Sequence, residues 1–130
     1  MLRAILAVLV GVFAWAVVAT VLNLGLRLAW PDYAAAEPAM RFSLEMMFAR
    51  LLVGVLASVA AGLVAALVAR RFKWPVYIVV LVLLLVFIPI HHDLWARFPA
   101  WYHLFFLASL AVFTLLGAAS HRRFAVRAPT

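Results

Sequence analysis

Long apolar stretches that alternate with short polar segments are the main pattern of this 130-residue chain. Four of the stretches are long enough to cross a bilayer as helices, because about 20 apolar residues span the ~30 Å hydrocarbon core. They cover approximately residues 4–30, 41–69, 75–92 and 100–119. The pattern therefore predicts an all-α fold in which residues 1–130 form a single domain, a bundle of four antiparallel transmembrane helices.

Prolines and basic residues mark the segments between these stretches. Pro31 and Pro38 bound the first segment, residues 31–38, which we expect to be a loop because proline interrupts a helix. Basic residues fill the next turn, and Pro75 suits the first position of the third helix. The basic segment 121–127 follows the last stretch, and we expect it to fray from the helix.

Composition agrees with a membrane protein. Hydrophobic residues make up 71% of the chain and charged residues 12%, whereas a soluble domain is about half apolar and a quarter charged. The net charge of +7 does not indicate a nucleic-acid partner, because the basic residues flank apolar stretches and form no continuous basic face. The chain has no cysteine, which excludes disulfides, thiol catalysis and iron–sulfur clusters.

The distribution of charge predicts the orientation. Four spans place both termini and the turn between the second and third helices on one side of the membrane. Most of the basic residues fall on that side: Arg3, Arg70, Arg71, Lys73, Arg122, Arg123 and Arg127. Because cytoplasmic segments carry the excess of Lys and Arg, we expect both termini in the cytoplasm and the chain in the inner (cytoplasmic) membrane.

Small residues recur at every fourth position of the second helix, at Gly54, Ser58 and Gly62, and Gly11 lies in a shorter stripe of the first helix. Such spacing lets two helix backbones approach closely within a bilayer. One interpretation is packing within the four-helix bundle. The other is an interface with a subunit of a larger membrane assembly.

Polar residues within the spans gather toward the outer side. Asn23 and Arg27 share one face of the first helix, and Glu45 and Arg50 lie in the outer half of the second. Ionisable groups inside a membrane usually face protein and have partners, so we expect Arg50 to pair with Glu45 or Asp93. The cluster is either a structural ion pair that fixes helix register or an outward-facing site for a small ligand or ion.

Three histidines lie between and beside the last two helices. Counting outward from the turn places His91 level with His103 across the hairpin, with His92 adjacent. An interfacial hydrogen-bonding role is the simplest interpretation. The alternatives are a zinc or copper site, a proton relay and, less favoured, bis-histidine haem. No cofactor is predicted, although a metal ion stays an alternative.

The run Phe98-Pro99-Ala100-Trp101-Tyr102-His103-Leu104-Phe105-Phe106-Leu107 resembles part of certain small bacterial inner-membrane proteins. These are uncharacterised four-span proteins in which a Pro-x-Trp-Tyr-His run opens the last helix. The resemblance implies the same four-span fold and membrane, and it implies no activity.

The sequence leaves three functional hypotheses. The first is a non-enzymatic accessory or structural subunit that packs through its spans against other membrane subunits. The second is a small transporter or binding module that uses the outer polar cluster. The third is a metal- or haem-binding redox protein that uses the histidines. An enzyme is not favoured, because no hydrolytic triad, phosphate-binding loop or dinucleotide-binding turn is recognisable.

Overall fold

A computed structural model describes residues 1–127 of the protein, the last four of them by backbone alone. Within that range the fold is all-helical, as predicted, and four of its helices are long and apolar enough to cross a membrane. The long helices are α1 (Leu2–Ala29), α3 (Leu44–Ala69), α4 (Trp74–Asp93) and α5 (Ala100–Arg127). A short 3-10 turn, η2 (Trp95–Arg97), joins α4 to α5.

Two boundaries differ from the expected ones. Helix α3 begins at Leu44, three residues after the predicted start, because the Ser43 hydroxyl caps it by accepting a hydrogen bond from the Met46 amide at 3.3 Å. Helix α5 continues to Arg127, so the prediction that the basic segment 121–127 frays is wrong. That segment contains neither proline nor glycine, and cations are favourable near the C-terminus of a helix.

The predicted loop at residues 31–38 is also wrong, because the segment folds into α2 (Pro31–Ala36) and the 3-10 turn η1 (Glu37–Ala39). Each of its prolines occupies one of the first two positions of a new helical turn. A proline there loses nothing, since those amides have no helical acceptor and the fixed φ suits the turn. Met40 then adopts a left-handed conformation, with φ of 52°, and ends the turn.

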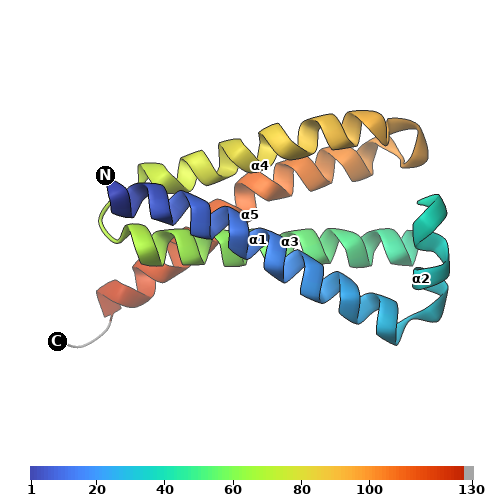
Figure 1. Ribbon diagram of the computed structural model, residues 1–130, viewed down its shortest axis with the longest axis horizontal. Coiled ribbons are helices and arrows are strands. Elements are labelled where there is room, and N and C mark those ends of the chain that lie inside the picture. The colour runs from blue at the N-terminus through green and yellow to red at the C-terminus, as the bar shows by residue number, and fades with distance from the viewer. Residues whose placement is uncertain (128–130) are drawn as a thin grey trace.

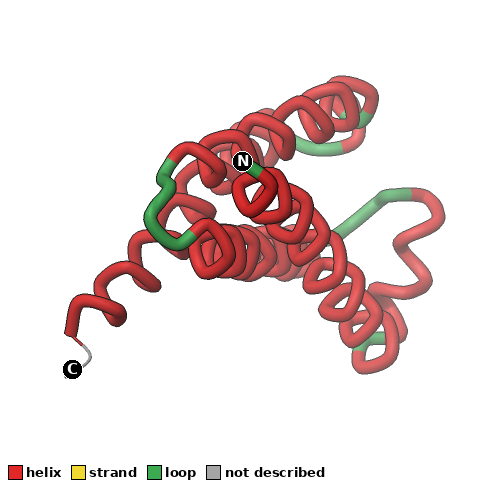
Figure 2. Tube along the Cα trace, turned by 60° about the vertical axis from the view of Figure 1, so that its left-hand side comes forward, coloured by secondary structure: helices red, strands yellow, loops and turns green. Residues whose placement is uncertain are grey.

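The chain passes back and forth along one long axis (Figure 1). The N-terminus and the last turns of α5 lie at one end, called here the termini end, and α2 lies at the other, called the α2 end. Helix α3 is central and packs mainly on α1 and α5, while α4 packs on α5 and α1. Toward the α2 end, α1 diverges from the α4–α5 hairpin, as both ribbon views show (Figures 1 and 2).

Close helix contacts concentrate toward the termini end. A Cβ atom added at Gly62 would overlap the carbonyl oxygen of Thr114, and one at Gly117 would overlap that of Val59, so α3 and α5 touch backbone to backbone. Gly11 meets the side chains of Ala65 and Val79 at 3.0 Å from its ideal Cβ position. The small-residue stripes predicted from the sequence therefore pack within the bundle.

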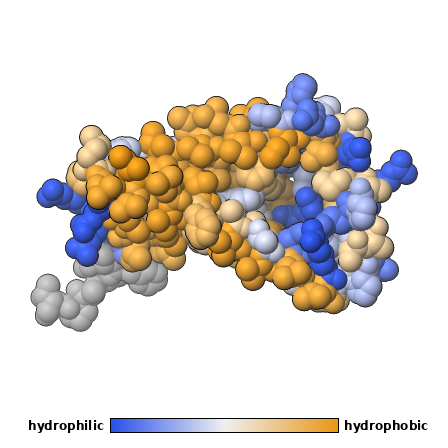
Figure 3. Space-filling view, in the orientation of Figure 1, coloured by the Kyte–Doolittle hydropathy of each residue, from blue (hydrophilic) through white to orange (hydrophobic). Residues whose placement is uncertain are grey.

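Hydropathy follows the same long axis (Figure 3). Apolar side chains cover most of the face in view, and hydrophilic residues gather toward the two ends. Many large apolar side chains are exposed along the helices, for example Phe13, Leu52, Leu85 and Leu104. Such a surface suits contact with lipid chains and not with water.

Candidate functional site

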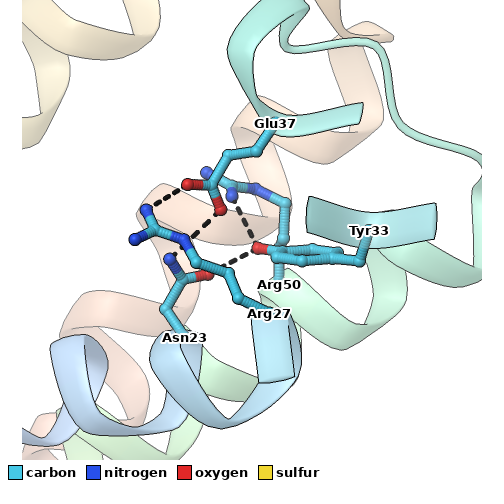
Figure 4. A network of polar contacts seen from close by, with 5 residues as sticks. All are labelled: Asn23, Arg27, Tyr33, Glu37 and Arg50. Carbon is cyan, nitrogen blue, oxygen red and sulfur yellow. Dashed lines mark hydrogen bonds and ion pairs between the residues drawn. The ribbon is translucent and has the colours of Figure 1, made fainter. Parts of the chain in front are cut away.

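A network of hydrogen bonds at the α2 end joins α1, α2, η1 and α3 (Figure 4) and extends to α5 through Tyr102. Its outer part is an ion pair between Arg27 of α1 and Glu37 of η1. Asn23, one turn before Arg27 on α1, donates from Nδ2 to Glu37 Oε2 at 3.3 Å. The hydrogen bond from Arg27 holds the pKa of Glu37 below its ordinary value, so the carboxyl is ionised at neutral pH.

Tyr33 of α2 is the centre of this network. Its ring is fully buried and stacks on Phe42, with ring centroids 5.3 Å apart. Its hydroxyl donates to Asn23 Oδ1 at 2.5 Å and accepts from Arg50 Nη1 at 2.9 Å. One phenol oxygen therefore joins α1 to α3, and the short helix α2 is what places it there.

Arg50 of α3 is held by aromatic residues. Its Nε donates to the Tyr102 hydroxyl of α5 at 3.3 Å, and its guanidinium carbon lies 4.6 Å from the centre of the Phe42 ring. A cation over an aromatic face gains an electrostatic contact without a counter-ion. Among the residues whose side chains are described, no carboxylate oxygen lies within 4.0 Å of this guanidinium.

The predicted pairing of Arg50 with Glu45 or Asp93 is therefore wrong. Glu45 precedes Arg50 by five residues, which places the two side chains about 140° apart around the helix, and Glu45 is exposed. Asp93 is 84% exposed and lies 3.7 Å from the equally exposed His92. Of the five polar residues predicted to cluster, Asn23, Arg27 and Arg50 share one network, while Glu45 and Asp93 lie outside it.

Three residues of the network were not among the predicted site residues: Tyr33, Glu37 and Tyr102. Tyrosines near a membrane boundary are common as interfacial anchors, so the two phenols carried no distinguishing signal. Glu37 lay in the segment interpreted as a loop. Its separation of ten residues from Arg27 does not indicate a contact unless the chain turns back at α2.

A cavity of about 150 Å³ lies beside Arg50, and all four long helices line it. Its polar wall consists of Asn23, Arg50 and Tyr102, and its apolar wall consists of Trp15, Val53, Gly54, Phe87 and Phe106. The indole N–H of Trp15 is satisfied by the Ser58 hydroxyl at 3.1 Å, and Ser58 in turn donates to the Gly54 carbonyl. The apolar wall therefore offers no free donor from Trp15, and Arg50 is the one charged residue of the lining.

Two buried histidines lie against this cavity wall. His91 of α4 and His103 of α5 meet with their Nδ1 atoms 2.7 Å apart, which confirms the prediction that the two are level. The His91 ring packs on the cavity-lining Phe106, with ring centroids 4.5 Å apart. His92 points away and is 88% exposed.

The contacts of the pair define its neutral tautomers. His103 Nε2 lies 3.3 Å from the Trp95 carbonyl oxygen, which only accepts, so this nitrogen carries the proton. His103 Nδ1 is then the acceptor, and His91 Nδ1 donates to it. This assignment follows from the hydrogen-bond network.

A metal site would need a further ligand beside this pair. In the described part of the chain, no three His, Cys, Asp or Glu residues come close enough together to hold a metal ion. His92, the third metal-ligand candidate, is exposed and contacts Asp93. Metal binding stays an alternative interpretation of the sequence.

No protein-family model matches this chain, and neither a curated protein nor a solved structure matches it. The resemblance of the Phe98–Leu107 run to small four-span proteins stays a prediction. A function must therefore be inferred from the cavity and the hydrogen-bond network beside it.

Proposed function

We propose that this protein is a binding module of the cytoplasmic membrane whose outward-facing cavity takes up a small anion. In this proposal its four spans are antiparallel and both termini are cytoplasmic, in agreement with the excess of basic residues in the terminal segments and the turn that follows α3. The α2 end, with the cavity and the polar network, then faces outward. Uptake of the anion would make it either a receptor or the binding part of a transporter.

The observation that carries the proposal is the positive charge of Arg50 at the cavity. Arg27 is paired with Glu37, which leaves Arg50 without a carboxylate partner among the described side chains. A charge within a membrane span costs at least ~2.5 kcal/mol, so such residues usually have a partner or a function. An anion in the cavity supplies the missing partner.

The geometry of Arg50 also leaves donors for a ligand. A guanidinium has five N–H donors in a planar fork, and the contacts of Arg50 with Tyr102 and Tyr33 use one at Nε and one at Nη1. The remaining donors are suited to planar, bidentate recognition of an oxyanion. The two tyrosines fix the orientation of the fork in advance, which lowers the entropic cost of binding.

The accessory-subunit hypothesis drew on the apolar body of the protein, on its short loops and on its stripes of small residues. The stripes of small residues that motivated it are covered by helices of the same chain, at Gly11, Gly54 and Gly62. They present no groove to a second protein. A stoichiometric partner that co-purifies from native membranes would nevertheless restore that hypothesis.

Thermal unfolding of the purified protein in detergent tests the proposal. The oxyanions are sodium acetate and sodium phosphate, each compared with sodium chloride at equal ionic strength. We expect an oxyanion to raise Tm, because a ligand stabilises the folded state that binds it. Arg50→Gln should abolish the stabilisation. Arg41→Gln is the matched control, because Arg41 is exposed at the same end of α3.

The proposal fails if no oxyanion raises Tm in the natural protein. It also fails if the stabilisation persists in Arg50→Gln, since the anion would then bind elsewhere. Loss of the stabilisation in both arginine variants would indicate a general effect of surface charge and would equally count against the cavity.

A further inference from the structure

We propose that the anion is a monocarboxylate with a short apolar chain of about three carbons. This inference rests on the proposed anion site and specifies its ligand. The carboxylate would lie against Arg50 and Tyr102, and the chain would extend along the apolar wall toward Trp15 and Phe106.

The cavity lining is divided into two layers along the helix axes. Arg50 and Gly54 are four residues apart on α3, and Tyr102 and Phe106 are four residues apart on α5, so each pair stacks on one helix face. At about 1.5 Å per residue, the apolar member lies roughly 6 Å farther from the α2 end. The same order holds on α1, where Trp15 is two turns farther in than Asn23. A ligand that fits both layers is charged at one end and apolar at the other.

Tyr102 adds a donor to the charged layer. Its hydroxyl oxygen accepts a hydrogen bond from Arg50 Nε, and the described residues include no acceptor for its own proton. Tyr33, by contrast, already donates to Asn23. The Tyr102 O–H and the free N–H groups of Arg50 therefore supply two kinds of donor to one anion, and donation to a charged acceptor is stronger than to a neutral one.

Charge and shape favour a carboxylate over a phosphate. Arg50 is the one charged group in the lining, so a monoanion balances it, whereas a phosphate group carries about −1.5 to −2 at pH 7. The apolar wall would leave the extra oxygens of a tetrahedral anion without donors. Burying polar atoms without hydrogen bonds is unfavourable.

The size of the cavity matches a short chain. A volume of about 150 Å³ is close to that of an engineered apolar cavity that accepts benzene, a ligand of six carbon atoms. A carboxylate group accounts for three heavy atoms, which leaves room for about three carbons. Butyrate therefore matches the cavity, and acetate fills only its polar layer.

A substitution at Gly54 can change the shape of the apolar layer of the cavity. A Cβ atom at this position would lie 2.9 Å from Cε2 of Phe106, so the ring must move when alanine is introduced. Gly25 of α1 is a matched control, because a Cβ there has no atom within 4 Å. Both variants exchange a helical glycine for alanine, and only Gly54→Ala changes the cavity lining.

The experiment is an NMR titration of the cavity-lining Trp15 indole N–H, identified by its loss in Trp15→Phe. The ligands are acetate, propionate and butyrate, with butyramide as a neutral molecule of the same shape. We expect affinity to increase by about fourfold for each methylene, as burial of a CH₂ group predicts. Gly54→Ala should flatten this series, Gly25→Ala should leave it unchanged, and butyramide should not bind measurably.

The outcomes distinguish failure of the inference alone from failure of the proposed function. If acetate and butyrate bind equally, and Arg50→Gln abolishes both, the ligand class is wrong while the anion site stands. If phosphate binds more tightly than butyrate in an Arg50-dependent way, the same conclusion holds. If no anion shifts the Trp15 signal, or if butyramide binds as well as butyrate, both proposals fail. The series in the natural protein decides the question even if Gly54→Ala does not fold.

Discussion

The two ends of the bundle are built differently. At the termini end, α1 contributes Ala4, Ala7 and Gly11 as its buried residues, and α3 touches α5 through the backbone at Gly62 and Gly117. At the α2 end, α1 has no buried residue after Gly11, and it diverges from the α4–α5 hairpin. The same helices therefore pack closely at one end and line a half-open cavity with one polar wall at the other.

This difference shows how a small membrane protein can hold a charged site. Close packing of small residues stabilises helix association where lipid supplies no hydrophobic drive. From that contact, α1 and the α4–α5 hairpin diverge toward the α2 end. Tyr33 and Glu37, supplied by α2 and η1, then fill part of the opening and tie α1 to α3 through hydrogen bonds.

The largest effect on stability should come from disrupting the helix packing at the termini end. Because a Cβ at Gly62 would overlap the Thr114 carbonyl, Gly62→Val should separate α3 from α5 and lower the free energy of unfolding by more than about 3 kcal/mol. The measurement is an unfolding titration in mixed detergent micelles. Gly25→Val makes the same exchange at an open position and should change stability by less than about 1 kcal/mol. Equal effects of the two substitutions would show that α3 and α5 do not pack this closely.

A smaller effect should come from the histidine pair at the α2 end. In the tautomers derived above, His91 donates to His103, so His91→Leu leaves a buried acceptor unsatisfied and should cost about 1–3 kcal/mol. His91→Asn keeps an N–H donor near the same position and should cost less. His92→Leu should stay within about 0.5 kcal/mol, because His92 is exposed. A larger cost for Asn than for Leu at position 91 would contradict the assigned hydrogen bond.

Helix packing and the level of the histidines were more predictable from the sequence than the partners of Arg50. Apolar stretches define helices locally, and the spacing of Gly54, Ser58 and Gly62 indicates a packing face without knowledge of the partner. The level of His91 with His103 followed from counting along a short hairpin. These inferences need only the geometry of a helix and the position of one turn between helices.

The partners of Arg50 needed more than local geometry. Helical angles could have excluded Glu45, which is five residues away, and could have placed Asp93 on the face opposite His91. The actual partners, Tyr33 and Tyr102, come from a short helix and from a distant one. Tyr33 could not be assigned, because Pro31 and Pro38 were interpreted only as ends of helices and not as starts of new turns.

The smallest expected effect on stability concerns the ion pair between Arg27 and Glu37 at the α2 end. The pKa of Glu37 is lower in the folded protein than its ordinary value of about 4.5, because Arg27 donates to the carboxylate. A depressed folded-state pKa means that the stabilisation is fully present above the unfolded value and is lost as the pH falls through the folded value. Tm should therefore decrease by at most a few degrees as the pH falls below about 4.5, since the pair is near the surface and partly screened.

Glu37→Gln should remove this part of the pH dependence while preserving acceptance of the Asn23 amide through its carbonyl oxygen. Glu45→Gln, at an exposed position outside the network, should leave the dependence unchanged. High salt should reduce the difference between the natural protein and Glu37→Gln, because it screens exposed charges. If acid lowers Tm equally in all three proteins, then the charge of Glu37 does not contribute to stability at the α2 end, and the ion pair with Arg27 is not what links η1 to α1.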